Sequence, residues 1–437
     1  MTGPMTPQPS LEAVAYQGRS LLFFDVAAEF ERLRTLPEIQ WDDVNDGNLA
    51  DIVVKRTGMR VDNHVDDYAD GFFAEPPLLD AKNPYYKLVA DIALQDGRKD
   101  TLERFQRCVR LAKDSLAWVD LPKAQVRGVF STMPCRIFLS TDVIADRDFS
   151  SEELAAMYIH ELGHLFSFFE TLAYSTVSNV VITGAVDALR GVEDKSARYK
   201  LVSQALTVFA TPEKDTVNAI AESDNNDIIQ ALILRTFEEG EQERTRGLSV
   251  DRERPTNTRS LEYLADQFAI RNGAALPLAT AQHKMAKQNR MDYGRGNTSF
   301  FAIQAVRLGL LTVTFAASSS VGLIALTIVS LLQTVSAANS DSTADPSERI
   351  GFVKADLVQI LKNPKLDPLM RKQVLSDVEA IDALRETIKE HQGIFRYLWR
   401  TLSPRGRSQS KLREFQKGLE DLVNNDLFVQ ASRLRSH

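Results

Sequence analysis

Cysteine is the residue that this sequence lacks most clearly, with only Cys108 and Cys135 among its 437 residues. Two cysteines this far apart make neither a disulfide framework nor a cysteine-based zinc site. An excess of positive charge is also missing, since the formal net charge is -7 at pH 7. Nucleic acid is therefore not expected as a partner. The first ten residues lack the basic start and apolar core of a secretory signal.

Histidine is scarce too, with six in the chain, yet two of them fall in His160-Glu161-Leu162-Gly163-His164. Residues 154–169 are apolar nearly all round, which indicates a buried helix. On a helix, His160 and His164 share one face and can hold one zinc ion, while Glu161 can act on a zinc-bound water. The alternative is a surface helix with a solvated histidine pair, which the apolar neighbours argue against.

A catalytic zinc usually has three protein ligands, so one ligand remains to be found. The extended metzincin pattern needs a glycine at position 167 and a histidine at position 170, where this chain has Ser167 and Glu170. Glu170 lies about 240° around the helix from His164, so it is a poor ligand. The missing carboxylate must therefore come from another helix.

Residues 260–270 form the best candidate for that helix, with a buried face that includes Leu264 and Phe268. Glu262 is the predicted third ligand, and Asp266, one turn further on, can hold the second ring nitrogen of a ligand histidine. The alternative is an ordinary solvated pair of carboxylates. His283 is a candidate hydrogen-bond donor to the oxyanion of the reaction, although a structural or surface histidine is the competing interpretation.

The sequence before the motif predicts two strands, at 126–130 and 136–140. The second is expected to be an edge strand, which could pair with an extended or unfolded polypeptide substrate. The acidic stretch 62–70 does not have the spacing of a calcium loop and indicates a solvated loop. Ser150 and Glu153 have the spacing of a capping box, so the motif helix is predicted to start there.

Three segments together resemble the HtpX and CAAX-prenyl-protease group of zinc metallopeptidases, which are gluzincins and often membrane-associated. They are Arg136-Ile137-Phe138-Leu139, the run from Ser151 to His164, and Glu262-Tyr263-Leu264-Ala265-Asp266, which matches the Glu-x-x-Ala-Asp motif. The likeness covers about residues 126–273. It implies that His160, His164 and Glu262 bind one Zn²⁺ per chain, that Glu161 is the catalytic base, and that Asp266 supports a ligand.

Charged residues are absent from 308 to 340, and the most apolar part, 308–335, is long enough to cross a bilayer. A buried helical hairpin is the alternative, because the centre of the run is rich in serine. The basic residues before it would place its N-terminal side in the cytoplasm. The sequence therefore predicts membrane association through 308–335, with a cytoplasmic peptidase domain.

The expected architecture is mainly α with some β: a zincin-like core of active-site helices, a small β-sheet edge, and helical N- and C-terminal extensions. The expected division is a helical region 1–120, a metallopeptidase domain 121–300, a hydrophobic segment 301–340 and a charged helical region 341–437. The expected function is zinc-dependent endopeptidase activity. The alternatives are a catalytically inactive zincin-fold scaffold and a membrane-associated interaction protein.

Overall fold

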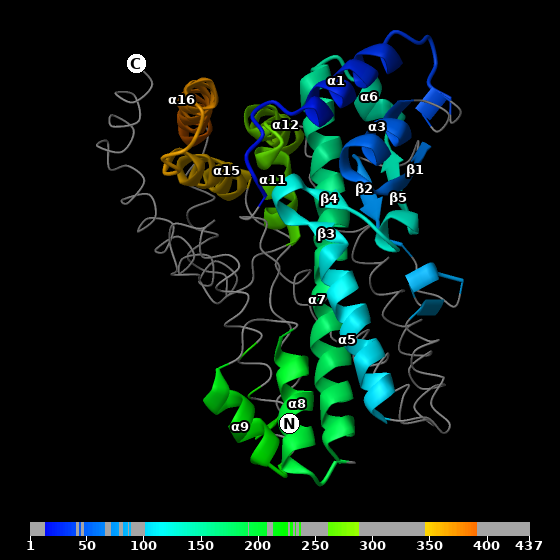
Figure 1. The fold of residues 1–437 in the computed structure, drawn as a ribbon. Coiled ribbons are helices and arrows are strands. Elements are labelled where there is room, and N and C mark those ends of the chain that lie inside the picture. The colour runs from blue at the N-terminus through cyan, green and yellow to red at the C-terminus, as the bar shows by residue number, and fades with distance from the viewer. Residues whose placement is uncertain are drawn as a thin grey trace, which may run out of the picture.

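A computed structural model of the chain provides the fold (Figure 1). The described part of the chain is mostly helical, with one small three-stranded sheet and a two-stranded one, as the sequence predicted at this level. The described residues are 14–40, 43–44, 48–65, 71–77, 82–85, 87–88, 101–190, 192–207, 213–225, 228–229, 232, 236, 261–287 and 346–390.

The central element is α7, a helix of 40 residues from Ser151 to Arg190 (Figure 1). The capping box at its start is confirmed: the Ser150 amide donates to Glu153 Oε2 at 2.7 Å, and the Glu153 amide donates to Ser150 Oγ at 3.1 Å. Beyond the motif, α7 continues to Arg190 without a break. No proline occurs between residues 151 and 190, so nothing in the backbone stops the helix.

The main sheet has the strand order β1-β5-β2, with β1 at Arg60–Val65, β5 at Pro134–Leu139 and β2 at Phe73–Glu75. β1 runs parallel to β5, and β2 runs antiparallel to it. The prediction of an edge strand at 136–140 is wrong, because β5 lies between the other two strands. Among the described residues, β2 is the edge strand nearest α7. The first half of the acidic stretch belongs to β1, and 66–70 lie outside the described residues.

The prediction of a strand at 126–130 is also mostly wrong. Only Gln125–Val126 (β4) is extended there, and it pairs with β3 at Val119–Asp120. A 3-10 helix, Leu121–Lys123 (η2), makes the turn between them, and a second one follows at Phe130–Thr132 (η3).

One face of the main sheet packs toward α7 through alternate buried residues. The residues on this face include Val61, Cys135 and Ile137, each of which is at most 2% exposed. The Tyr158 hydroxyl of α7 donates to Asn63 Oδ1 at 2.8 Å, which ties the helix to β1 within the buried interface. Because β1 lies in the first 120 residues, that part of the chain contributes directly to the sheet around the motif helix.

Helices surround this core. α1, α11 and α12 pack against the N-terminal part of α7, while α5 runs beside its C-terminal half (Figure 1). The bounds of these and of two further helices near the sheet are Leu21–Leu33 (α1), Asn48–Thr57 (α3), Thr101–Ala117 (α5), Thr141–Ala145 (α6), Leu261–Arg271 (α11) and Ala275–Lys287 (α12).

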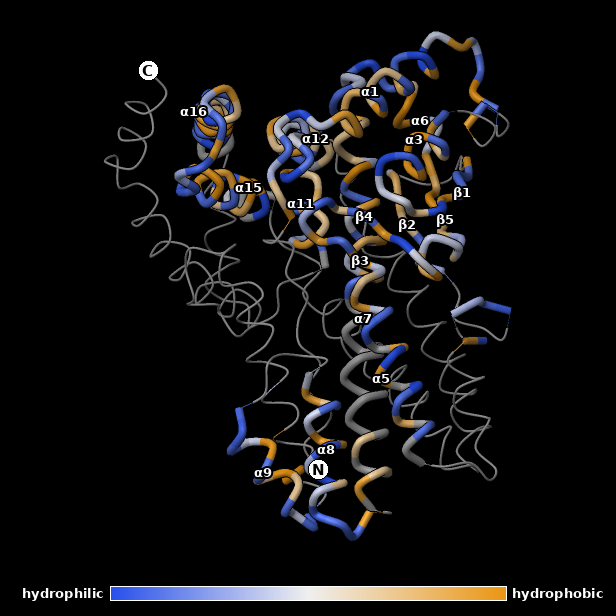
Figure 2. Tube along the Cα trace, viewed as in Figure 1, coloured by the Kyte–Doolittle hydropathy of each residue, from blue (hydrophilic) through white to orange (hydrophobic). Residues whose placement is uncertain are grey.

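A second apolar cluster lies at the far end of α7, where α8 (Lys195–Leu206) packs against α7 and α9 (Lys214–Glu222) packs against α8. Figure 2 shows apolar residues in the strands and surrounding helices, and again in this distant group. The single helix α7 therefore contributes to both clusters. The last two described helices, α15 (Pro346–Leu361) and α16 (Pro368–Glu390), form a hairpin beside α11 and α12.

The prediction of a membrane-spanning helix is corrected. In the described part of the chain, no helix combines the length and the apolar character needed to cross a bilayer. α7 has sufficient length but places Glu161 and Glu170 within its apolar run. The segment 308–335, on which the prediction was made, lies outside the described residues.

Replacing Gly273 with Ala is expected to destabilise the fold by about 2–4 kcal/mol. Gly273 links α11 to α12 with φ +83°, and an added Cβ would lie 1.9 Å from the Gly18 carbonyl oxygen. The backbone there is already held, since the Gln17 amide donates to the Arg271 carbonyl at 3.0 Å. Thermal and denaturant unfolding of Gly273→Ala measure the loss, and an unchanged free energy of unfolding would contradict the close contact.

Candidate metal centre

The motif residues on α7 point to one side of the helix, as the spacing predicted. His160 and Glu161 are buried, with side chains 9% and 5% exposed, and His164 is 13% exposed. The centroids of the two imidazole rings are 4.8 Å apart, and the rings are nearly perpendicular. Potential ligand atoms of these three residues lie within 4.8 Å of one another.

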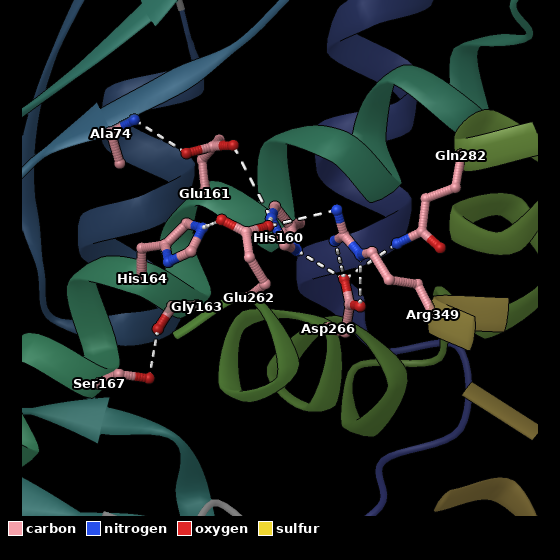
Figure 3. A network of polar contacts seen from close by, with 10 residues as sticks. All are labelled: Ala74, His160, Glu161, Gly163, His164, Ser167, Glu262, Asp266, Gln282 and Arg349. Atoms are coloured by element: carbon pink, nitrogen blue, oxygen red, sulfur yellow. Dashed lines mark hydrogen bonds and ion pairs between the residues drawn. The ribbon is translucent and has the colours of Figure 1, made fainter. Parts of the chain in front are cut away.

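Glu262 comes to this group from the first turn of α11 (Figure 3). Its Oε2 lies 3.3 Å from His160 Nε2, and its Oε1 lies 3.4 Å from His164 Nε2. The side chain is 22% exposed, so the solvent side of the group is at Glu262 and His164. The structure thus brings the predicted third ligand to the two histidines.

The close approach of α7 and α11 depends on small residues at their crossing. A Cβ placed on Gly163 would lie 2.7 Å from Ala265 Cα and 2.9 Å from Phe268 Cβ. Gly163 therefore lets the backbones of the two helices approach more closely than a side chain would allow. Since Glu262 is only three residues before Ala265, this contact sets its distance from the histidines.

Asp266 lies one turn beyond Glu262 and supports His160 from behind. Its Oδ1 is 2.9 Å from His160 Nδ1, the ring nitrogen that faces away from Glu262. The same oxygen accepts a hydrogen bond from Gln282 Nε2 of α12 at 3.0 Å. The contact is the one that the sequence predicted for Asp266, on a ring nitrogen of a motif histidine; its role in supporting a metal ligand stays a prediction.

Glu161 is held from the sheet side by the edge strand β2. Its Oε2 accepts a hydrogen bond from the Ala74 backbone amide at 2.8 Å, while its Oε1 lies 4.0 Å from His160 Nε2 (Figure 3). One carboxylate oxygen is thus fixed and the other is turned toward the histidines. The sequence did not predict this contact, because it indicated no strand at the position of β2.

Arg349 of α15 is a site residue that sequence reasoning missed. Its Nη2 and Nε donate to the two oxygens of Asp266 at 2.6 and 3.1 Å, and its Nη1 lies 3.2 Å from Glu262 Oε2. The residue follows Pro346 at the start of a charged segment, where a single arginine has no distinguishing pattern. Only the packing of α15 on α11 reveals its position.

His283 is not the residue of α12 that contacts Asp266. Gln282 makes that contact, and adjacent helix residues are rotated by about 100°, so His283 faces another direction. His283 is half-buried. Its suggested role as a donor to the reacting oxygen stays a prediction.

The charges around His160 favour carboxylates that remain ionised. Burial alone would raise the pKa of Asp266, but the Arg349 charge and the contact with His160 keep it below its ordinary value. Burial would likewise raise the pKa of Glu262, yet the positive charges around it hold it well below its usual range. Burial acts to lower the pKa of His160, but Asp266 and Glu262 outweigh it and raise the pKa to about 10.

The other two motif side chains show mainly the effect of burial. It lowers the pKa of His164 to about 4, so the imidazole is neutral and carries a lone pair for a cation. It raises the pKa of Glu161 to about 8. A divalent cation nearby would favour the charged carboxylate and lower this pKa again.

The donor set fits a zinc ion. Zinc binds imidazole nitrogen and carboxylate oxygen at about 2.0–2.2 Å in a tetrahedral arrangement, which separates ligand atoms by about 3.3 Å. The contact of Glu262 Oε2 with His160 is 3.3 Å long and that of Glu262 Oε1 with His164 is 3.4 Å long, so each carboxylate oxygen lies at about this separation from one imidazole nitrogen. His160, His164 and Glu262 are therefore the residues that could hold the ion.

Comparisons with known proteins add no family to this picture. No family model, no curated protein and no solved structure matches the chain. The chemistry of the site must therefore be inferred from its own geometry.

Proposed function

We propose that this protein is a zinc-dependent endopeptidase whose metal ligands are His160, His164 and Glu262. The observation that carries the proposal is the convergence of these three side chains, from two helices about a hundred residues apart, at distances that suit one ion. The resemblance to the HtpX and CAAX-prenyl-protease group supports the same assignment. We further propose that α7, α11 and the main sheet form a zincin-like core.

Glu161 is the proposed general base. A zinc ion in such a site lowers the pKa of water and polarises a substrate carbonyl. Ala74 fixes one oxygen of Glu161, so the other can accept a proton from the attacking water and return it to the leaving amine. Asp266 contacts Nδ1 of His160 and keeps the ring oriented, with Nε2 directed at Glu262.

The edge strand β2 is the proposed place for the substrate backbone. The Ala74 amide points at Glu161 and not at β5, so an extended polypeptide along this edge would pass the general base. This replaces the earlier expectation that β5 pairs with the substrate. An extended segment can use such an edge more readily than a folded one, which favours unfolded or loop regions as substrates.

Purified protein is expected to bind one zinc ion per chain and to be stabilised by it. Binding to the folded state alone raises the free energy of unfolding by about 4 kcal/mol at a free zinc concentration 1,000-fold above Kd. Elemental analysis and thermal unfolding with and without a chelator measure both effects. His164→Ala should lose the ion, whereas the control His283→Ala should retain it.

Hydrolysis of denatured casein, with and without chelator, tests the activity itself. Chelator-sensitive cleavage is expected. Absence of stoichiometric zinc in the wild-type protein would remove the proposal. Zinc binding without any hydrolysis of unfolded substrates would favour the inactive scaffold instead.

A further inference from the structure

Arg349 reaches the metal centre from a part of the chain that lies well beyond the predicted peptidase domain. Its guanidinium contacts both oxygens of Asp266 and one oxygen of Glu262, as described above (Figure 3). The side chain is 12% exposed, and Asp266 is 2% exposed. The contact is therefore a buried one, and a planar guanidinium that holds two carboxylates also fixes their relative orientation.

A second ion pair fixes α15 on α11 independently of the metal centre. Arg271 Nη2 of α11 donates to Asp356 Oδ1 of α15 at 3.0 Å, and Gln267 Nε2 donates to the same oxygen at 3.1 Å. Asp356 is seven residues after Arg349, so both lie on one face of α15. The ion pair between Arg271 and Asp356 lies near the site along α11, but it involves none of the proposed ligands.

The hydrogen bonds of Asp266 also require Arg349. The Asp266 side chain is 2% exposed, and without the guanidinium its described partners would be His160 and the amide of Gln282. A buried carboxylate that loses two donors is left short of hydrogen bonds and moves toward other donors. Such a movement would release His160 from its orientation.

We propose that Arg349 is a positioning residue of the metal centre. It sets the orientation of Glu262 directly and that of His160 through Asp266, so the α15–α16 hairpin is a working part of the site. The inference rests on the proposed function, because the three side chains that it orients are the proposed zinc ligands.

The test compares Arg349→Met with the matched variant Asp356→Asn, which weakens the same α11–α15 interface away from the ligands. Zinc affinity is measured by competition with a chromophoric chelator, below the unfolding temperature of each variant. Arg349→Met is expected to bind zinc about 10- to 100-fold more weakly than the wild type. Asp356→Asn is expected to unfold at a lower temperature but to keep the wild-type zinc affinity.

Arg349→Lys provides a second measurement in case Arg349→Met does not fold. Lysine keeps the charge but cannot hold two carboxylates in a planar fork, so an intermediate zinc affinity is expected. Visible spectra of the Co²⁺-loaded proteins should show altered ligand geometry in both Arg349 variants and not in Asp356→Asn.

Three results overturn the inference: wild-type zinc affinity in the folded Arg349 variants, an equal loss of zinc affinity in Asp356→Asn, or unchanged Co²⁺ spectra. Failure of the wild-type protein to bind zinc is a different outcome, because it rejects the proposed function together with this inference.

Discussion

The Glu161→Gln variant is expected to lose about 10²- to 10⁴-fold in kcat for peptide hydrolysis while it still binds one zinc ion. Glutamine keeps an oxygen that can accept the hydrogen bond from the Ala74 amide, so the side chain should stay in place. It cannot accept a proton from water at neutral pH, so the general base is lost. The three proposed ligands are untouched, which is why zinc affinity should not change.

Glu170→Gln is the matched control for this variant. Glu170 is also a buried glutamate of α7, 2% exposed, but it lies nine residues on and therefore on the opposite side of the helix. Its replacement should leave kcat near the wild-type value. Full activity of Glu161→Gln with zinc bound would contradict the assignment of Glu161 as the general base.

The Gly163→Ala variant is expected to lose most of its zinc affinity and to be destabilised by about 1–3 kcal/mol. The added methyl group would lie 2.7 Å from Ala265 Cα and 2.8 Å from the Ala265 carbonyl oxygen, so α7 and α11 must separate. Separation moves Glu262 away from His160 and His164. Alanine favours a helix over glycine by about 1 kcal/mol, but a clash with backbone atoms exceeds that gain.

Gly351→Ala is the control for helix propensity. Gly351 is half-buried within α15, and its replacement is expected to leave zinc affinity unchanged and stability equal or higher. Zinc titration and denaturant unfolding of both variants separate the two effects. If Gly163→Ala bound zinc as the wild type does, the close helix crossing would not be what places Glu262.

Local patterns predicted the parts of the site that lie on single helices. The spacing of His160 and His164 and the capping box at Ser150 are properties of a few neighbouring residues, so they are visible in the sequence. The same holds for Glu262 and Asp266, whose helix has a clear apolar face. That the two helices share one site was predicted from the need for a third zinc ligand and from the resemblance to the HtpX and CAAX-prenyl-protease group.

Tertiary contacts decided the rest, and no local pattern contains them. β1 and β5 are parallel strands about 75 residues apart in the sequence. The local sequence of either strand therefore does not indicate which strand will pair with it. A strand such as β5 looks like an edge until its neighbours are known. Arg349 was missed for the same reason, because its partners are 83 and 87 residues earlier in the chain.

The candidate metal centre draws on positions as distant as Ala74 and Arg349. During translation, α15 leaves the ribosome after every other contributor has been made, and contacts of such long sequence separation form slowly. A nascent chain that ends before residue 349 has Asp266 in place but no guanidinium to hold it. Capture of the proposed zinc ion in this geometry would therefore follow synthesis of about four fifths of the polypeptide.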